Sequence, residues 1–158
     1  MSRSMWPLLI SFALSLLVTT FGPVSAQDQT KQSIAIFFAL PLQRQHEEFR
    51  TYTLEKQYEI FIYSMQRRHP ADLSFAYDIA SKGQAAADFL SVKLQGTNDE
   101  WTQENIIYVF EVMAKQKYYS VGSDRKLITQ VRRAVTSMKR TDIRENSERS
   151  LKTILDAS

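Results

Sequence analysis

The stretch FLSVKLQGTNDEWTQENIIYVFEVM, residues 89–113, contains two blocks of helix-like apolar spacing that are separated by a polar turn. The first block ends at Gly96, a residue type that is common just past the last turn of a helix. The polar residues at 97–99 are candidate N-caps for a longer helix over about 100–117. Because the turn is short, the stretch predicts an antiparallel helical hairpin.

The longer helix of this hairpin carries two apolar stripes. They lie about 100° apart on a helical wheel and consist of Ile106, Val109, Phe110 and Met113 in one stripe and Trp101, Asn105, Tyr108 and Val112 in the other. The remaining face is assigned to Gln103, Glu104 and Glu111. An outer helix needs only one apolar stripe, so this helix is predicted to be central and covered on two sides.

Helical spacing recurs through the rest of the chain and glycine is scarce, so the predicted fold class is all-α. Thr53 and Ser123 are candidate N-caps, and residues 33–42, SIAIFFALPL, fit a helix, a strand or an apolar hook over the end of a bundle. Pro41 interrupts any helix in this segment, and we favour a helix. Further helices are expected over about 42–49, 54–69, 71–82, 84–95, 123–138 and 142–155.

The segments LSFAYDIASKG, AAADFLSVKLQ, GTNDE and WTQENIIYVFEVMA follow one another within residues 73–114. A helix that ends in Gly, a short partner helix, a polar turn with Asp and a helix with an early aliphatic pair resemble HEAT-like repeats over about residues 71–117. In that family antiparallel helix pairs stack into an α-solenoid, so the resemblance implies a scaffold that binds other proteins. Three self-similar units are not found, and a compact five- to six-helix bundle is the alternative to a short α-solenoid.

The N-terminus has the three parts of a secretory signal peptide: a basic residue at Arg3, an apolar run over 6–21, and small residues up to Ala26. The run is short for a membrane span of ~20 residues, so we predict cleavage after Ala26 and no stable membrane span in the mature chain. An uncleaved anchor is the alternative. The predicted organisation is a signal peptide (1–26), an N-terminal apolar segment with a lead-in helix (27–52) and a helical domain (53–158).

The sequence contains no cysteine, which favours a periplasmic or secreted protein held together by packing over a disulfide-rich extracellular scaffold. Residues 47–114 carry eleven acidic and six basic side chains, whereas residues 115–140 carry eight basic and one acidic. Such asymmetry is typical either of a partner surface or of a solvated helix face. The basic segment lacks interleaved aromatic residues, and a nucleic-acid partner is not expected.

The sequence offers little for catalysis or metal binding. A His-Glu-x-x-His zinc helix starting at His46 would need histidine where Arg50 stands, and no cysteine is present to bind zinc. Nucleophile elbows, phosphate-binding loops and dinucleotide fingerprints are absent. We therefore expect no metal, no cofactor and no enzymatic activity. A hydrolase that uses two carboxylates, such as Glu104 with Glu111, is the remaining enzymatic alternative.

The stripe of Trp101, Asn105 and Tyr108 is either a second packing face, with the amide hydrogen-bonded inside it, or an exposed groove whose aromatic rings anchor a partner. The adjacent tyrosines and the basic segment would extend the same surface. The predicted partner surface consists of Trp101, Asn105, Tyr108, Tyr118, Tyr119, Arg125, Lys126, Arg132 and Arg133.

These observations predict an exported, non-enzymatic helical protein that binds another envelope or secreted protein as a binding or scaffold module. Three alternatives stay open: a periplasmic immunity or inhibitor protein directed at an exported toxin, a carboxylate-dependent cell-wall hydrolase, and a carrier of an apolar ligand between helices. The pattern predicts no particular oligomeric state.

Overall fold

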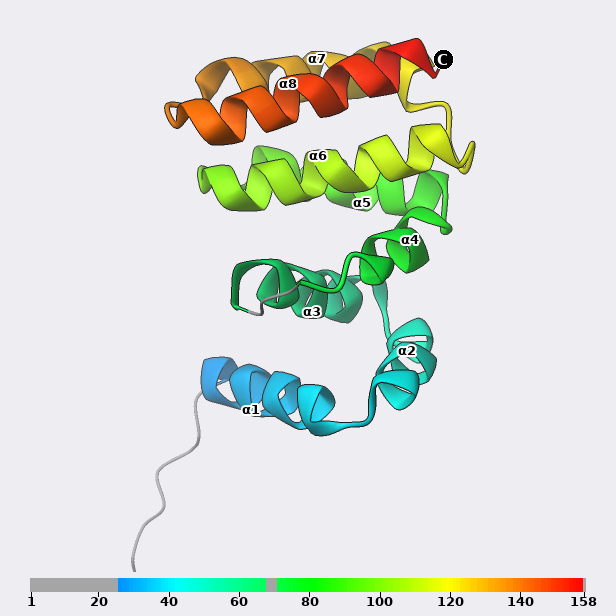
Figure 1. The fold of residues 1–158 in the computed structure, drawn as a ribbon, viewed down its shortest axis with the longest axis vertical. Helices are drawn as coiled ribbons and strands as arrows, with labels where there is room; N and C mark the ends of the chain where they lie inside the picture. The colour runs from blue at the N-terminus through cyan, green and yellow to red at the C-terminus, as the bar shows by residue number, and fades with distance from the viewer. Residues whose placement is uncertain (1–25, 68–70, 158) are drawn as a thin grey trace, which may run out of the picture.

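The computed structural model describes residues 26–67 and 71–157, and this part of the chain is helical throughout (Figure 1). It contains no strand, which confirms the all-α prediction. The eight α-helices in the described residues exceed the five or six expected for a compact bundle. They are α1 (Ala26–Ala39), α2 (Leu42–Thr51), α3 (Leu54–Arg67), α4 (Ser74–Ala80), α5 (Gln84–Gln95), α6 (Glu100–Lys115), α7 (Arg125–Ser137) and α8 (Thr141–Asp156), with a 3₁₀ turn at Val121–Ser123.

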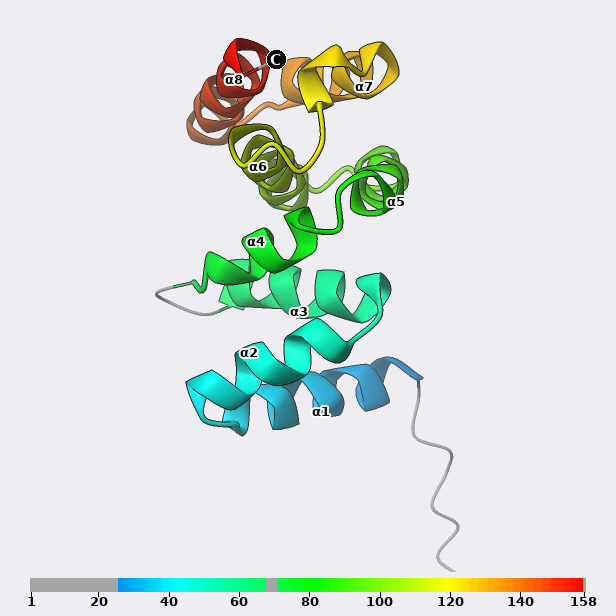
Figure 2. The same cartoon turned by 90° about the vertical axis from the view of Figure 1, so that its right-hand side faces the viewer.

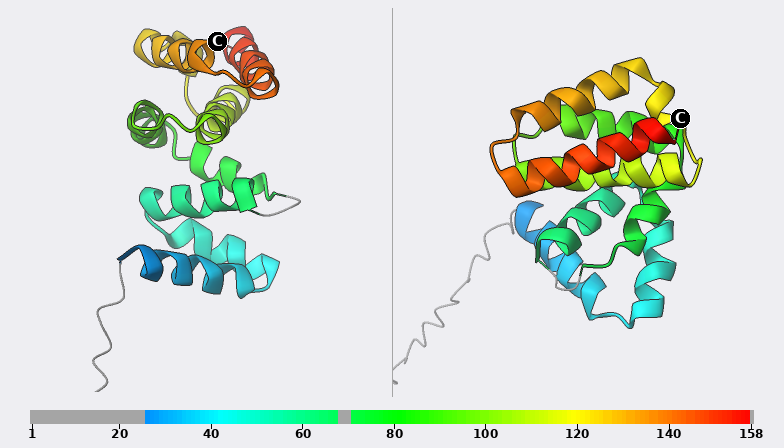
Figure 3. Two further views of the ribbon diagram at one scale, coloured as in Figure 1. Left: turned by 90° about the vertical axis from the view of Figure 1, so that its left-hand side faces the viewer. Right: turned by 45° about the horizontal axis from the view of Figure 1, so that its top comes forward.

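Successive helix pairs are stacked along the long axis of the molecule (Figures 1 and 2). One side of the stack contains α4, α6 and α8, with α8 packed on α6 and α6 on α4. The other side contains α5 and α7, which also pack on each other. Figure 3 shows α7 and α8 at the C-terminal end and α1 and α2 at the opposite end. The layered arrangement has the form of a short α-solenoid, while a relationship to HEAT-like repeats stays a prediction.

The ambiguous segment 33–42 is helical up to Ala39 and contains no strand, which confirms the favoured interpretation. Helix α1 ends at Ala39, and Pro41 precedes the first residue of α2 with φ −55° and ψ 145°. The Phe37 ring lies 6.4 Å from the Phe49 ring and 5.9 Å from the Phe75 ring, measured between centroids. These aromatic contacts bury one face of α1, and the segment therefore covers the N-terminal end of the stack.

Aspartate side chains set the starts of two helices. Asp99 caps α6 by accepting a 2.9 Å hydrogen bond from the Thr102 N–H, as one of the residues at 97–99 was expected to do. Asp124 caps α7 by accepting a 3.0 Å bond from the Leu127 N–H. The prediction of Ser123 as this cap is wrong, because Ser123 belongs to the 3₁₀ turn and α7 begins at Arg125, directly after Asp124.

Two positions with positive φ shape the turns around α4 and α6. Gly83, between α4 and α5, has φ 58° and ψ −130°, and a Cβ built there would lie 3.0 Å from the Tyr118 carbonyl oxygen. Lys117 has φ 57° at the end of α6, where the Tyr118 N–H donates to the Met113 carbonyl at 2.9 Å. This left-handed ending stops α6 at Lys115, two residues before the predicted end.

Helix α4 is shorter than the predicted helix over 71–82. The Asp72 carboxylate accepts a 2.9 Å hydrogen bond from the Ser74 N–H, which places the helix start at Ser74. The predicted end of α3 at 69–70 and the predicted signal peptide, apart from Ala26, lie outside the described residues. No helix in the described ranges combines the length and apolar character that a membrane crossing would require.

Helix α6 is central, as its two stripes predicted: it packs against α3, α4, α5 and α8. The first stripe is fully buried. The assignment of Gln103 to a polar outer face is wrong, because its side chain is only 7 % exposed. Its amide nitrogen donates to the Thr97 carbonyl at 2.9 Å, and this bond allows the polar group to lie beneath the α5–α6 turn.

Candidate functional site

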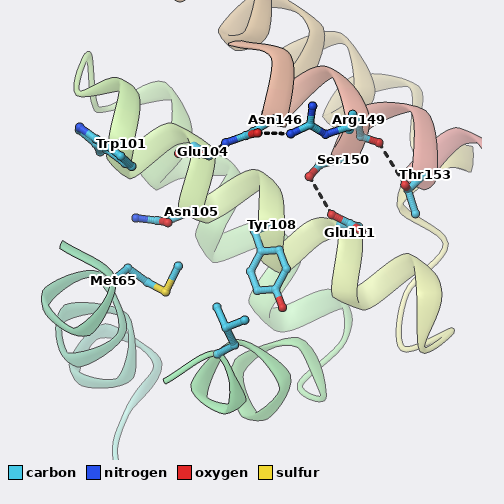
Figure 4. Close-up of a pocket in the computed structure, with 11 residues that line it drawn as sticks. Met65, Trp101, Glu104, Asn105, Tyr108, Glu111, Asn146, Arg149, Ser150 and Thr153 are labelled. Carbon is cyan, nitrogen blue, oxygen red and sulfur yellow. Dashed lines mark hydrogen bonds between the residues drawn. The ribbon is translucent and has the colours of Figure 1, made fainter. Parts of the chain in front are cut away.

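A groove of about 510 Å³ runs between α6 and α8, with the end of α3 and the start of α4 forming its lower edge (Figure 4). We call it the α6–α8 groove. Helix α6 contributes the largest share of its lining, which consists of Trp101, Glu104, Asn105, Tyr108 and Glu111. Steps of three or four residues bring successive side chains to one face of a helix, so a single face of α6 supplies this set.

The residues of the second stripe differ in exposure, so the stripe is neither wholly core nor wholly surface. Trp101 is 45 % exposed, Tyr108 is partly buried, and Asn105 is only 4 % exposed at the floor between them. The stripe is therefore neither a closed packing face nor a fully solvated surface. It lines an open depression on a helix that the rest of the fold holds in place.

The apolar wall of the groove joins three helices. Met65 from α3 and Leu73 just before α4 face the aromatic side chains of α6. Leu73 is 47 % exposed, so apolar surface remains accessible at this edge. Burial raises the pKa of Tyr108, and the nearby Tyr77 raises it further. Tyr108 is therefore neutral at physiological pH and offers a hydroxyl at the end of an apolar ring.

One face of the Trp101 ring is covered by a cation. The Arg140 guanidinium carbon lies 4.8 Å from the ring centroid, within the range of a cation–π interaction. The same guanidinium forms a 2.8 Å ion pair with Asp142 at the start of α8. Glu100 accepts hydrogen bonds of 2.8 and 3.0 Å from the N–H groups of Lys139 and Arg140. These contacts attach the α7–α8 connection to the beginning of α6.

The polar wall comes from α8. Asn146 donates a 2.8 Å hydrogen bond to Glu104 Oε1, and the Arg149 guanidinium donates to Asn146 Oδ1 (Figure 4). Further along, Ser150 donates a 2.7 Å bond to Glu111, which also lies 3.5 Å from the Lys115 ammonium. Both groove carboxylates therefore accept a hydrogen bond from α8, but among the described residues only Glu111 forms an ion pair.

Burial raises the pKa of Glu104, and the hydrogen bond from Asn146 opposes this effect without cancelling it. None of the ion pairs between described residues includes Glu104. Arg140 and Arg149 act on it only as more distant charges. The carboxylate is half-buried, and no ion pair with another described residue compensates its charge.

The Asn105 side chain is the second incompletely satisfied group in the groove. Its amide nitrogen is buried and has no hydrogen-bond partner among the described residues. In Figure 4 this nitrogen points away from α6, into the space between Trp101 and Met65. A buried donor without a partner costs about 1–3 kcal/mol. The groove floor thus carries a donor whose bonding capacity is unused within the described chain.

The nine residues of the predicted partner surface are not brought together. Trp101, Asn105 and Tyr108 line the groove. Tyr118 and Tyr119 lie in the turn beyond the other end of α6, where the Tyr119 hydroxyl donates to Asp124 at 2.9 Å. The basic members are exposed on α7, which lies behind α8 in Figure 1, and comprise Arg125, Lys126, Arg132 and Arg133.

Sequence reasoning missed a second cluster, formed by His46, Asp72 and Ser74. His46 Nε2 lies 3.2 Å from Asp72 Oδ2, and the Ser74 hydroxyl donates to Asp72 Oδ1 at 2.5 Å. The same hydroxyl oxygen is 3.4 Å from both ring nitrogens of His46, so it is aligned with neither. A nucleophilic serine needs its proton directed to the histidine, whereas here the carboxylate accepts it. The cluster therefore stabilises the turn that leads into α4.

Glu104 was also missed as a groove residue, because it was assigned to the polar face of α6. Its spacing of three from Trp101 and four from Tyr108 is the local signal that could have placed it beside them, whereas its partner Asn146 comes from 42 positions further along the chain. Groups of three or more metal-ligating side chains do not occur within the described ranges. No protein-family model, curated protein or solved structure is significantly similar to this chain.

Proposed function

We propose that the protein is an exported, non-enzymatic module that binds another envelope or secreted protein through the α6–α8 groove. The observation that carries this proposal is the Asn105 amide nitrogen, which has no hydrogen-bond partner in the described part of the chain and lies at the floor of an open groove edged by Trp101 and Tyr108. Tryptophan and tyrosine are enriched among residues that dominate binding energy, since they offer a large rigid area with a polar end. Their shared position on the central helix α6 supports a preorganised surface.

The partner is expected in the cell envelope or outside the cell because residues 1–26 have the pattern of a signal peptide. An immunity or inhibitor protein directed at an exported toxin is one specific form of this proposal, with the toxin as the occupant of the groove. The carrier hypothesis needs an enclosed cavity. The α6–α8 groove is open, and nearly half of Trp101 and of Leu73 is exposed.

A carboxylate-dependent cell-wall hydrolase is the second candidate function. The observation in its favour is Glu104, a half-buried carboxyl group in a groove with a raised pKa, as a general acid requires. The second carboxylate of the groove fits this chemistry less well. Glu111 accepts a bond from Ser150 and pairs with Lys115, and it lies two helical turns from Glu104, about 10 Å along the axis of α6.

A photo-crosslinking amino acid at position 153, on the α8 side of the groove, tests the proposed function in the full chain expressed in its native cells. The matched control carries the same group at Val92, which is 67 % exposed on α5 and away from the groove. We expect a discrete crosslinked protein from position 153 only, and its loss in the Trp101→Ala/Tyr108→Ala variant.

Equal crosslinking from both positions, or no crosslinked protein from position 153, would contradict the proposed function. Hydrolysis of purified cell-wall polymer by the wild type, abolished in a folded Glu104→Gln variant, would instead establish the second candidate. The substitution keeps an oxygen that accepts from Asn146 and removes only the ionisable group.

A further inference from the structure

Two neighbouring side chains of the α6–α8 groove are left with unused bonding capacity. Asn105 offers a buried N–H donor, and Glu104 offers a half-buried carboxylate without an ion-pair partner in the described chain. We infer that the groove recognises a lysine or arginine side chain on an exposed segment of the partner protein, with its charged end on Glu104 and a main-chain carbonyl of the same segment on Asn105. This inference rests on the proposed function.

The charge of the groove favours a cationic ligand group. Its lining includes two carboxylates, Glu104 and Glu111, and one guanidinium, Arg149. Arg149 is already hydrogen-bonded to Asn146 Oδ1, and Glu111 is already paired with Lys115. Glu104 is therefore the group whose charge a ligand can neutralise. Its Oε1 accepts from Asn146, while Oε2 has no hydrogen-bond partner among the described residues.

The apolar surroundings of Glu104 suit the aliphatic stem of a basic side chain. Trp101 precedes Glu104 by three positions and Tyr108 follows it by four, so both rings lie on the same side of α6 as the carboxylate. Lysine and arginine bury their stems along apolar surface while the charged end stays paired or solvated. Trp101 already has a guanidinium over its ring, from Arg140 at 4.8 Å.

The two contacts have different roles in selection. A main-chain carbonyl is present in every peptide, so the bond to Asn105 supports binding of any extended segment. The carboxylate discriminates, because a leucine in the groove would further desolvate Glu104 without pairing it, and a glutamate would add repulsion. The preference for a basic side chain is thus assigned to Glu104 and the general affinity to Asn105.

Four short peptides of the form acetyl-Gly-Ser-X-Ser-Gly-amide, with X as Arg, Lys, Leu or Glu, test the inference on the ¹⁵N-labelled full chain. The reporters are the Trp101 indole N–H and the Asn105 side-chain amide in nuclear magnetic resonance spectra, which detect millimolar binding. The Trp101 indole signal is distinguished from that of Trp6, the other tryptophan of the chain, by its absence in Trp101→Phe. We expect the Arg and Lys peptides to shift both signals and to bind roughly tenfold more tightly than the Leu and Glu peptides, a factor worth about 1.4 kcal/mol.

Three variants separate the contributions. Glu104→Gln is expected to remove the preference for basic peptides, whereas Glu111→Gln, a matched change in the same groove, is expected to keep it. Asn105→Leu should weaken the binding of the Arg and Lys peptides by a factor similar to their preference in the wild type. Both peptides should still bind more tightly than the Leu peptide. Equal or tighter binding of the Leu peptide, an unchanged preference in Glu104→Gln, or no shift with any peptide would overturn the inference. If the peptide inference fails but position 153 still crosslinks a partner, the proposed function remains supported. If position 153 crosslinks no partner, both the inference and the proposed function are contradicted.

Discussion

Replacing Asn105 by leucine should stabilise the free protein and weaken binding at the same time. The two side chains have the same number of non-hydrogen atoms and a similar branched shape, so the substitution creates no cavity. Asn105 is 4 % exposed and its amide nitrogen is unpartnered in the described chain. Removing a buried unpaired donor recovers about 1–3 kcal/mol, and leucine is also the better helix former.

We therefore expect the free energy of unfolding of Asn105→Leu to exceed that of the wild type by about 2 kcal/mol. For a chain of this size such a change corresponds to a rise in Tm of roughly 4–8 °C. The measurement is urea denaturation followed by far-ultraviolet circular dichroism, with the midpoint and the slope determined separately. An unchanged slope would show that the substitution alters stability alone.

Gln103→Met on the same helix is the control. Gln103 is also buried, but its amide nitrogen donates to the Thr97 carbonyl, so this substitution removes a bond that exists. It should lower the free energy of unfolding by about 1 kcal/mol or more, the opposite sign. A loss of stability of 1 kcal/mol or more in Asn105→Leu would refute the reasoning, because it would mean that the amide is well bonded in the free protein.

Four further substitutions test the groove, a helix cap and the turns. Glu104→Gln should be more stable than the wild type at pH 7, because burial penalises the charged carboxylate. Since the folded-state pKa of Glu104 is raised, the difference in unfolding free energy between the two proteins should vanish as the pH falls below the ordinary value of about 4.5. Urea titrations at pH 7 and pH 3.5 would check this. Asp124→Ala should cost about 1 kcal/mol at pH 7 through loss of the α7 cap. Hydrogen bonds from the Leu127 N–H and the Tyr119 hydroxyl hold the pKa of Asp124 below 3.8. The stability that this carboxylate contributes is therefore lost only as the pH falls through that lowered value. The difference in unfolding free energy between the wild type and Asp124→Ala should narrow in the same pH range. Gly83→Ala should lower the free energy of unfolding by about 2 kcal/mol, because the backbone conformation at this position is restricted to glycine. Lys117→Gly should raise it by about 1 kcal/mol, because glycine adopts the left-handed conformation without strain. Thermal unfolding of the two variants should therefore show shifts in Tm of opposite sign.

Local sequence determined most of the helices and the character of α6. Helical periodicity, and caps such as Asp99, depend on residues within about four positions of one another, so the spacing of apolar residues already indicates which faces will be buried. The two stripes of α6 predicted a central helix, and Pro41 predicted the break between α1 and α2. Local signals were less exact at the helix ends: α4 starts at Ser74, α6 ends at Lys115, and the cap of α7 is Asp124 instead of Ser123.

Only the tertiary structure decided which side chains form the groove. Glu104 lies outside both stripes of α6, yet α8 places Asn146 against it, and Met65 and Leu73 close the opposite wall from earlier helices. The same packing directs the basic face of α7 away from Trp101, which separates residues that the linear order had suggested as one surface. The period of a helix determines the direction in which each side chain points, but the neighbour that it meets depends on how helices distant in the sequence pack together.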